Sequence, residues 1–383
     1  MFKIRYQGRP LFITILGKCP YILSLANKTL IEIGRYLDPC PQDLRNYMST
    51  CRRLSGAGEY VRYNTVVVSG REGCLLLAML VSGTHTARRY CERIQRLWFR
   101  GWHDTDMFLN SELLSETLPL LTNLRTLWIE ASPVDTIHLM ERLNVEGVIR
   151  KRDHPAFAAF GPHDWTSQSS PLVLPNLKYL RLSGEFSMHK IASHRALTEL
   201  DLNSIMDGDE FAAFLDSVQD TLLGRHVETL AIRLCQELDL DFAVPLLAQA
   251  FPVLSRLSFE QSSLDFIKFA RALACDALAL PRIQYILLNE RLGRPISAVA
   301  GLLAQKIPDV EEIEPLLRRI HETRFRFESV GVGKVIWSIG LDGRYRKTTV
   351  NRRRSFWRDK FGQQFSSKLY PSPQRTFFIF QEE

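Results

Sequence analysis

The sequence has 383 residues, a net charge of +7, 45% hydrophobic residues and 24% charged residues. This length exceeds what one compact core needs and suits two or three domains or one elongated repeat array. The composition is that of a folded protein and excludes a long disordered polymer.

The excess positive charge gathers near the C-terminus. Residues 344–375 hold ten Lys or Arg and one acid, which leaves residues 1–343 close to neutral. Arg352, Arg353 and Arg354 lie beside Phe356 and Trp357, a mixture found in proteins that bind single-stranded nucleic acid. A nuclear-localisation patch or a solvated face fits the same residues, so we expect weak, sequence-independent binding of nucleic acid at most.

Cysteine usage and hydropathy indicate the compartment. The seven cysteines are odd in number and form no Cys-x-x-Cys pair, which excludes a disulfide framework. The longest uncharged run, residues 73–87, is too short to cross a bilayer. The apolar stretch 11–16 is short and is followed by Lys18, so it does not make a signal peptide. We expect no membrane contact and a cytoplasmic or nuclear location.

Residues 21–60 carry the pattern of a small helical segment. Leu30, Ile33 and Leu37 are spaced for one face of a helix, and Asn27 stands where it could cap that helix. Two prolines, at 39 and 41, would break the chain before a second helix. Spacing alone predicts helices here and nothing more.

The identity of these residues resembles the F-box motif, and the match continues into a strand at Thr65–Val68. The sequence departs from the motif at Ala26, where Pro is usual, and at Gly34, where a large apolar residue is usual. The matching residues are Leu25, Ile31, Glu32, Ile33, Tyr36, Leu37, Asp43, Leu44, Cys51, Arg52, Arg53 and Leu54.

The resemblance implies a substrate receptor of a Skp–cullin–F-box ubiquitin ligase. Such a chain binds the Skp adaptor, and through it a cullin, while other subunits transfer ubiquitin. The resemblance assigns adaptor binding to Leu25, Ile31, Ile33, Leu37 and Leu44. A helical cap that only shields the next domain is the simpler alternative.

The rest of the chain repeats the pattern apolar-x-x-apolar-x-apolar seven times, with starts separated by 30, 53, 20, 30, 27 and 29 residues. The alternating end of each copy predicts a short strand with one buried face. Residues 211–218 and 266–273 show helical spacing between copies. The copies are Ile94/Leu97/Phe99, Leu124/Leu127/Ile129, Leu177/Leu180/Leu182, Leu197/Leu200/Leu202, Val227/Leu230/Ile232, Leu254/Leu257/Phe259 and Ile283/Ile286/Leu288.

One strand and one helix in 20 to 30 residues resemble a leucine-rich repeat. The polar position that follows the strand in regular repeats fits only at Cys235, so we expect an irregular array. The long spacing contains several prolines and predicts a loop insertion at about 145–175. F-box and degenerate repeats together are similar to proteins abundant in mushroom-forming fungi. An ordinary doubly wound α/β sheet is the alternative, although no Gly-rich phosphate loop follows any strand.

Beyond residue 311 the pattern changes. Residues 335–340 and 345–350 flank an Asp-Gly pair and predict a β-hairpin that closes the open end of the array. We therefore expect an α/β chain that has an N-terminal helical F-box, an irregular leucine-rich repeat solenoid and a C-terminal β-hairpin cap. The expected domains are the F-box-like segment at 21–60, the repeat array at 61–320, and the cap with its basic tail at 321–383.

Residues that flank the middle apolar position of each strand point away from the core and should line one face of the array. Trp, Tyr and Arg residues supply most binding energy at protein interfaces. We therefore expect Trp98, Trp128, Tyr179 and Arg181 to form the strongest part of a target-binding site. The alternative is that the two tryptophans pack under the F-box or the inserted loop.

No catalytic motif accounts for the chain. Residues 328–335 resemble a phosphate loop but lack its first glycine and its Ser or Thr. His103, Asp104 and Asp106 have no further ligands at a metal-site spacing, and the His321–Glu322 pair lacks the second His of a zincin. We expect no enzyme activity, no cofactor and no metal. A free-standing repeat scaffold, associated with nucleic acid through its tail, is the alternative function.

Overall fold

The computed structural model describes residues 2–6, 9–13, 24–37, 41–101, 107–149, 173–184, 186–219, 221–234, 240–261, 266–275, 280–290, 310–323, 328–332, 335–339 and 345–349. These residues form a mixed α/β fold, as predicted. Of the loop insertion expected at about 145–175, residues 150–172 lie outside this described part, as do the Asp-Gly pair and the basic residues from 350 onward. None of the described helices is long and apolar enough to span a membrane.

A short antiparallel hairpin of β1 (Phe2–Tyr6) and β2 (Arg9–Ile13) forms a sheet of its own at the N-terminus. The sequence analysis did not predict it. The stretch that was examined as a signal peptide therefore begins in strand β2.

Three helices follow, α2 (Asn27–Leu37), α3 (Pro41–Thr50) and α4 (Arg52–Asn64). They share a small hydrophobic core in which Leu30 and Leu54 are fully buried. The Tyr47 hydroxyl donates a hydrogen bond of 2.8 Å to the Leu30 carbonyl oxygen, and burial raises the pKa of Tyr47 to about 12. The predicted helical segment is therefore present and has a core separate from that of the large sheet.

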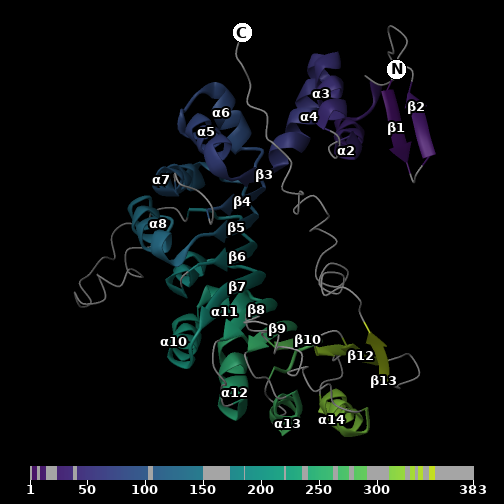
Figure 1. Ribbon diagram of the computed structural model, residues 1–383, viewed down its shortest axis with the longest axis vertical. Coiled ribbons are helices and arrows are strands. Elements are labelled where there is room, and N and C mark those ends of the chain that lie inside the picture. Colours follow the sequence, from purple (N-terminus) through teal and green to yellow (C-terminus); the bar gives the residue numbers. More distant parts are fainter. Residues whose placement is uncertain are drawn as a thin grey trace, which may run out of the picture.

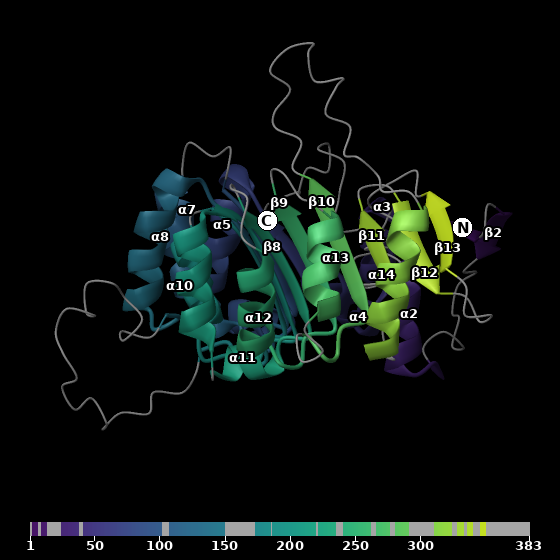
Figure 2. The same cartoon turned by 90° about the horizontal axis from the view of Figure 1, so that it is seen from below.

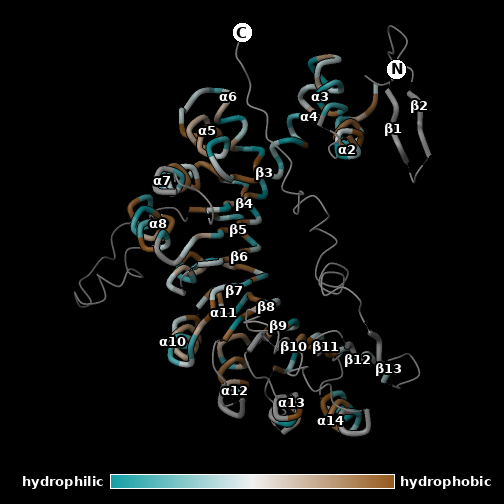
Figure 3. The backbone as a smooth tube through the Cα atoms, in the orientation of Figure 1, coloured by the Kyte–Doolittle hydropathy of each residue, from teal (hydrophilic) through white to brown (hydrophobic). Residues whose placement is uncertain are grey.

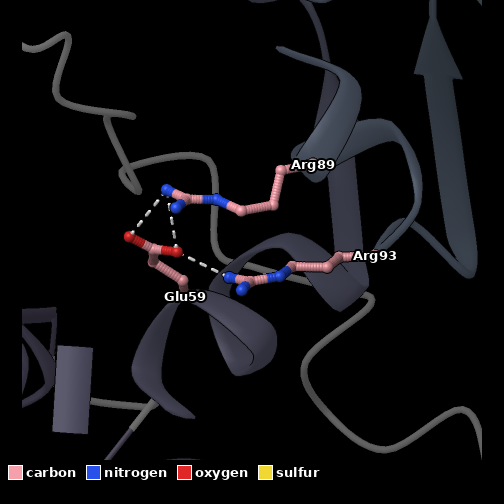
Figure 4. Close-up of polar contacts among 3 residues, drawn as sticks. All are labelled: Glu59, Arg89 and Arg93. Atoms are coloured by element: carbon pink, nitrogen blue, oxygen red, sulfur yellow. Dashed lines mark hydrogen bonds and ion pairs between the residues drawn. The ribbon is translucent and has the colours of Figure 1, made fainter. Parts of the chain in front are cut away.

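The last of these helices runs straight into the large sheet, because α4 ends at Asn64 and β3 (Thr65–Val68) begins at the next residue. Figure 4 shows Glu59 of α4 between Arg89 and Arg93, which lie within and just after α6 (His85–Cys91). Its carboxylate is 2.6 Å from Arg93 and 3.3 Å from Arg89. The rings of Tyr63 and Tyr90 stack beside these pairs at 3.8 Å. Helix α4 is thus held against the first repeat unit.

The large sheet has eleven strands, and its strands stand in the order of the chain. Strands β3 to β11 pair in parallel, and β11, β12 and β13 pair antiparallel. After β3 they are β4 (Arg96–Arg100), β5 (Thr126–Glu130), β6 (Tyr179–Ser183), β7 (Glu199–Met206), β8 (Thr229–Leu234), β9 (Arg256–Gln261), β10 (Tyr285–Glu290), β11 (Ser329–Val332), β12 (Val335–Ile339) and β13 (Tyr345–Thr349).

Helices connect the strands and cover the outer side of the arc that the strands form, as Figures 1 and 2 show. A doubly wound sheet would reverse its strand order and carry helices on both faces, so that alternative is wrong. The connecting helices are α5 (Gly70–Val81), α6, α7 (Met107–Thr117), η1 (Leu118–Leu120), α8 (Pro133–Val145), η3 (Phe186–Ala192), α10 (Gly208–Val218), α11 (Leu222–His226), α12 (Leu240–Ala250), α13 (Phe266–Cys275) and α14 (Val310–Thr323).

One row of apolar side chains runs through the sheet from β3 to β11. Its members occupy matching register positions on neighbouring strands, and each is at most 3% exposed. Figure 3 shows hydrophobic residues recurring along the strands and the helices that cover them. All seven predicted strands and the opening strand at Thr65–Val68 are present. The row is Val66, Leu97, Leu127, Leu180, Leu200, Leu230, Leu257, Ile286 and Val330.

The backbone joins successive units in the same way each time. The carbonyl oxygen of the residue before a strand accepts hydrogen bonds from two consecutive amides of the next unit, as Gln95 does from Arg125 and Thr126. The same pattern recurs at Arg125, Lys178, Thr198, Glu228, Ser255 and Gln284. The last of these connects to Ser329, so β11 belongs to the series, and Phe327, Val330 and Val332 carry the same sequence spacing as the other copies.

A tight turn precedes several strands, and it was missed in the sequence. The amide of Leu124 donates to the carbonyl of Leu121, and the same bond joins Leu177 to Leu174, Leu254 to Phe251 and Ile283 to Leu280. Each pair has the spacing apolar-x-x-apolar. The second residue of the pair is also the first apolar position of the repeated strand pattern. Asn123 and Asn176 in these turns donate to the carbonyls of Glu92 and Thr122 in the preceding unit. Two side-chain amides thus join neighbouring units just before their strands.

The predicted C-terminal hairpin is present as β12 and β13. Trp337 of β12 is 1% exposed and belongs to the main core, and the Tyr345 hydroxyl donates to the Leu317 carbonyl oxygen of α14 at 2.7 Å. The hairpin thus closes the apolar end of the sheet. Helix α14 extends to Thr323, across the predicted boundary at 320.

We predict that Gly224→Ala destabilises the fold because α11 approaches backbone atoms closely. A Cβ at Gly224 would lie 2.3 Å from the Ala250 carbonyl oxygen and 2.6 Å from that of Val218. Overpacking of this kind should lower the free energy of unfolding by about 1–3 kcal/mol, measured by urea denaturation. Gly56→Ala in α4, with no atom within 4 Å, is the control and should gain up to about 1 kcal/mol. Equal stability of Gly224→Ala and the wild type would contradict the prediction.

Candidate partner-binding surface

The sheet face opposite the helices lies on the inner side of the arc in Figure 1, and we call it the concave face. Its side chains form rows because the parallel strands hold matching residues side by side. One row runs through Arg96, Thr126, Tyr179, Glu199, Thr229, Arg256 and Tyr285. A second runs through Val67, Trp98, Trp128, Arg181, Asp201, Ala231 and Ser258. The predicted flanking residues therefore share one face.

The second row begins with a stack of aromatic and charged groups. The rings of Trp98 and Trp128 lie parallel, with centroids 4.1 Å apart and 7° between their planes. The Arg181 guanidinium lies 4.1 Å from the Trp128 ring centroid, within the range of a cation–π interaction. Arg181 also pairs with Asp201 at 3.3 Å. Four neighbouring strands are thus linked through their side chains.

This stack uses the tryptophans internally. Trp98 and Trp128 are 4% and 3% exposed and form a small cluster with Val67. The expectation that they are accessible anchors for a partner is therefore wrong, because tryptophans in register on adjacent strands cover each other. Tyr179 and Arg181 are half-buried and stay candidates. The face of the sheet to which a side chain points can be predicted from the sequence. Whether neighbouring side chains cover it cannot.

At the carboxyl end of β7 the concave face gains an exposed apolar residue. The register with β8 shifts between Asp201 and Ile205, and such an irregularity re-aims side chains. Ile205 is 41% exposed and lies beside Arg233. Asn203, two residues before it on the same face, donates to the Ser183 hydroxyl at 2.7 Å. Ile205 was not among the residues predicted for the site.

The middle of the first row carries a half-buried acid, Glu199. Burial raises the pKa of Glu199, and the repulsion of Glu228 adds to this, while Arg256 acts in the opposite direction. Farther along the row the Tyr285 hydroxyl donates to the Glu328 carboxylate, and burial with this contact raises the pKa of Tyr285 to about 12. The later strands therefore present charged groups that already interact with one another.

The five predicted adaptor-binding residues divide into two groups. Leu37 and Leu44 are 7% and 5% exposed and belong to the core of the three helices. Ile31 and Ile33 are half-buried, and Leu25 is 36% exposed. Of the five, Leu25, Ile31 and Ile33 are therefore the ones that keep some solvent exposure. Tyr36, at 67% exposure, adds an apolar group that the prediction left out.

The departure from the F-box motif at Gly34 has a local cause. A Cβ at this position would lie 3.1 Å from Val61 Cγ2 on α4 and 3.7 Å from Tyr47 Cε1. Glycine permits α2 and α4 to approach this closely, and a large side chain would force them apart. Arg53 ties the start of α2 to α4, donating to Asn27 Oδ1 at 2.9 and 3.0 Å and to the Leu25 carbonyl oxygen at 2.7 Å.

Most of the polar fragments considered in the sequence are not among the described residues. His103, Asp104, Asp106 and Lys334 lie outside the described residues. Within the described part of the chain, no three His, Cys, Asp or Glu side chains are grouped to hold a metal ion.

Comparisons of the chain with known protein families and with curated proteins find no match.

We predict that Trp128 and Arg181 are energetically coupled. Trp128→Leu removes the ring face and Arg181→Met removes the charge, so the two losses should not add. A double-mutant cycle in urea should give a coupling of about 0.5–2 kcal/mol. Trp128→Leu with Arg256→Met, on strands that do not adjoin, is the control pair and should be additive. Additivity in both cycles would show that the contact contributes nothing.

We also predict a pH-dependent effect of Glu199. Because the folded-state pKa of this carboxyl is raised, its contribution favours folding below the ordinary glutamate pKa and is lost as pH rises through the raised value. Glu199→Gln should therefore be more stable than the wild type at neutral pH, and the difference should shrink as pH falls. The measurement is the urea midpoint of each protein at neutral pH and at a pH near the ordinary glutamate pKa. Glu141→Gln, at an exposed position of α8, is the control for this comparison. A difference that grows on acidification would contradict the assignment.

Proposed function

We propose that this chain is a non-catalytic substrate receptor of a Skp–cullin–F-box ubiquitin ligase. In this proposal the helices α2–α4 are an F-box that binds the Skp adaptor. The strand–helix units form a degenerate leucine-rich repeat solenoid whose concave face binds a target protein. Ubiquitin transfer belongs to other subunits, so the chain needs no catalytic group of its own.

The observation that carries the proposal is a three-helix segment with its own core that leads without a linker into a parallel sheet of chain-ordered strands. Its sequence carries F-box residues, and its exposed positions include the apolar side chains Leu25 and Tyr36. Exposed apolar groups on a small polar segment are typical of a contact surface. Regular spacing of strand and helix supports the repeat assignment.

The sheet gives the same proposal its second surface. Parallel strands on an arc expose many side chains at matching heights, a geometry that solenoid proteins use to hold extended partners. Here the concave face offers Tyr179, Arg181, Ile205 and Arg233 from neighbouring strands. A receptor needs two separate surfaces, and the helices and the sheet provide one each.

Adaptor capture tests the proposal. Leu25→Asp should reduce capture of the Skp adaptor at least about tenfold, because it places an uncompensated charge in an apolar contact. Leu25 is exposed, so the variant keeps the internal core that a substitution at Leu37 would damage. The measurement is a pull-down with purified adaptor, scored with a cullin as well.

The matched control is Ile137→Asp, an equally charged change at an exposed apolar position of α8 that is 58% accessible. It should capture adaptor as the wild type does. Failure of the folded wild-type chain to bind any Skp adaptor would refute the proposal and leave the free-standing scaffold.

A further inference from the structure

Helix α6 and the residues just after it carry more positive than negative charge. The stretch 85–93 contains three Arg and one acid, Glu92, which gives it a net charge of +2. Two of these arginines, Arg89 and Arg93, reach across to helix α4 and meet the same carboxylate, that of Glu59, as Figure 4 shows. Two positive charges thus surround one negative charge, and the remaining charge favours a partner of the opposite sign.

The two arginines hold Glu59 unequally. Arg93 Nη1 donates to Glu59 Oε2 at 2.6 Å, and the Arg93 side chain is 21% exposed. Arg89 Nη2 lies 3.3 Å from both carboxylate oxygens, and the Arg89 side chain is 42% exposed. Hydrogen bonds between guanidinium and carboxylate groups are usually about 2.7–2.9 Å long. Arg93 is therefore the principal partner of Glu59, and Arg89 is held by it only weakly.

Arg89 keeps donors that Glu59 does not use. A guanidinium group donates hydrogen bonds from each of its nitrogen atoms, and the contacts with Glu59 involve only the Nη2 atom of Arg89. Within the described part of the chain, Arg89 Nε is buried and has no acceptor. A buried donor without an acceptor costs free energy. A second carboxylate at Arg89, together with a small shift of its side chain, would therefore satisfy donors that Glu59 leaves unused.

The contact with Glu59 also shows which chemistry fits this site. The group that Arg89 and Arg93 already bind is a carboxylate, and guanidinium groups pair with carboxylates through parallel hydrogen bonds. The Arg89 guanidinium lies 5.5 Å from the centroid of the Tyr90 ring, a cation–π contact that helps to hold it in place. A peptide segment rich in Asp or Glu would therefore meet a guanidinium group that is already positioned.

The neighbouring aromatic rings favour a peptide over a nucleic acid. Single-stranded nucleic acids bind by stacking their bases on exposed rings. Tyr63 and Tyr90 stack on each other with ring centroids 3.8 Å apart, and Tyr63 is 7% exposed. Each ring thus covers one face of the other, and what this surface offers to a partner is guanidinium charge.

We propose that Arg89 binds an acidic peptide segment of a partner protein at the junction of α4 and α6. In this arrangement Arg89 contacts the incoming carboxylate, and Arg93 stays paired with Glu59. The inference does not rest on the proposed function, because these residues belong neither to the exposed apolar groups near α2 nor to the strands of the concave face.

The experiment measures fluorescence anisotropy of a labelled glutamate–glycine peptide that is titrated with the full-length protein. The wild type should bind the peptide with an affinity that falls as salt rises. Arg89→Gln should weaken binding about tenfold, the loss expected for one charge-assisted contact. Arg318→Gln on α14 is the matched control, because this arginine is also exposed and pairs with a glutamate, and it should bind as the wild type does.

A second variant, Glu59→Gln, separates recognition from a purely structural ion pair. It removes the carboxylate that competes with the peptide, so the peptide should bind about tenfold more tightly. The stacked rings of Tyr63 and Tyr90 still join α4 to α6, so the variant should fold. If the ion pairs served the fold alone, this variant would lose stability and gain no affinity for the peptide.

Several results would overturn the inference. These are a wild type that does not bind the peptide, equal binding by Arg89→Gln and the wild type, or a folded Glu59→Gln variant that binds no more tightly. Tighter binding of a lysine–glycine peptide, or of single-stranded RNA with the same dependence on Arg89, would also contradict it. If Glu59→Gln does not fold, the comparison of Arg89→Gln with Arg318→Gln decides alone.

Discussion

Burial of one apolar side chain per strand, in register across nine parallel strands, is the constraint on which the rest of this structure depends. A strand–helix unit exposes an apolar edge on each side, and only the neighbouring units cover it. The row from Val66 to Val330 is continuous for this reason. At one end helix α4 and the pairs around Glu59 meet the first unit, and at the other Trp337 covers the last. The same row determines the concave face. In each strand the residues on either side of the buried row member point to the opposite face of the sheet.

Much of this could be predicted from the sequence. Three apolar positions at fixed spacing identified seven strands, and their order follows from having one unit per strand. Strand β11 was missed because the spacing was followed only as far as Leu288, although Phe327, Val330 and Val332 repeat it. Its place follows from its parallel pairing with β10 and from the bonds that the Gln284 carbonyl accepts. The turns before the strands were present in the sequence as a second apolar pair, but their role depends on hydrogen bonds between units.

For the candidate site residues, the sequence predicted which face each side chain points to but not whether solvent can reach it. Trp98 and Trp128 point to the face that alternation assigns them, yet they bury each other, since their strands are adjacent and in register. Leu37 and Leu44 carry the F-box pattern, yet they fill the core of their own three helices. In both cases the answer depends on which residues meet across elements that are distant in sequence. Gly34 shows the converse, because an apparent defect of the motif is what the close approach of α2 to α4 requires.

The turns before the strands have a further consequence for how such a chain can change. From Leu121 to Ile129, from Leu174 to Leu182, from Phe251 to Phe259 and from Leu280 to Leu288, the spacing of apolar residues is identical. Gains and losses of chain length are therefore confined to the stretch between the end of one strand and the next turn. That stretch includes residues 150–172, whose base is fastened by Arg195 through bonds to the carbonyls of Val148 and Val173. One rim of the arc is thus fixed by its own hydrogen bonds, and added length at the other rim leaves the register of the sheet unchanged.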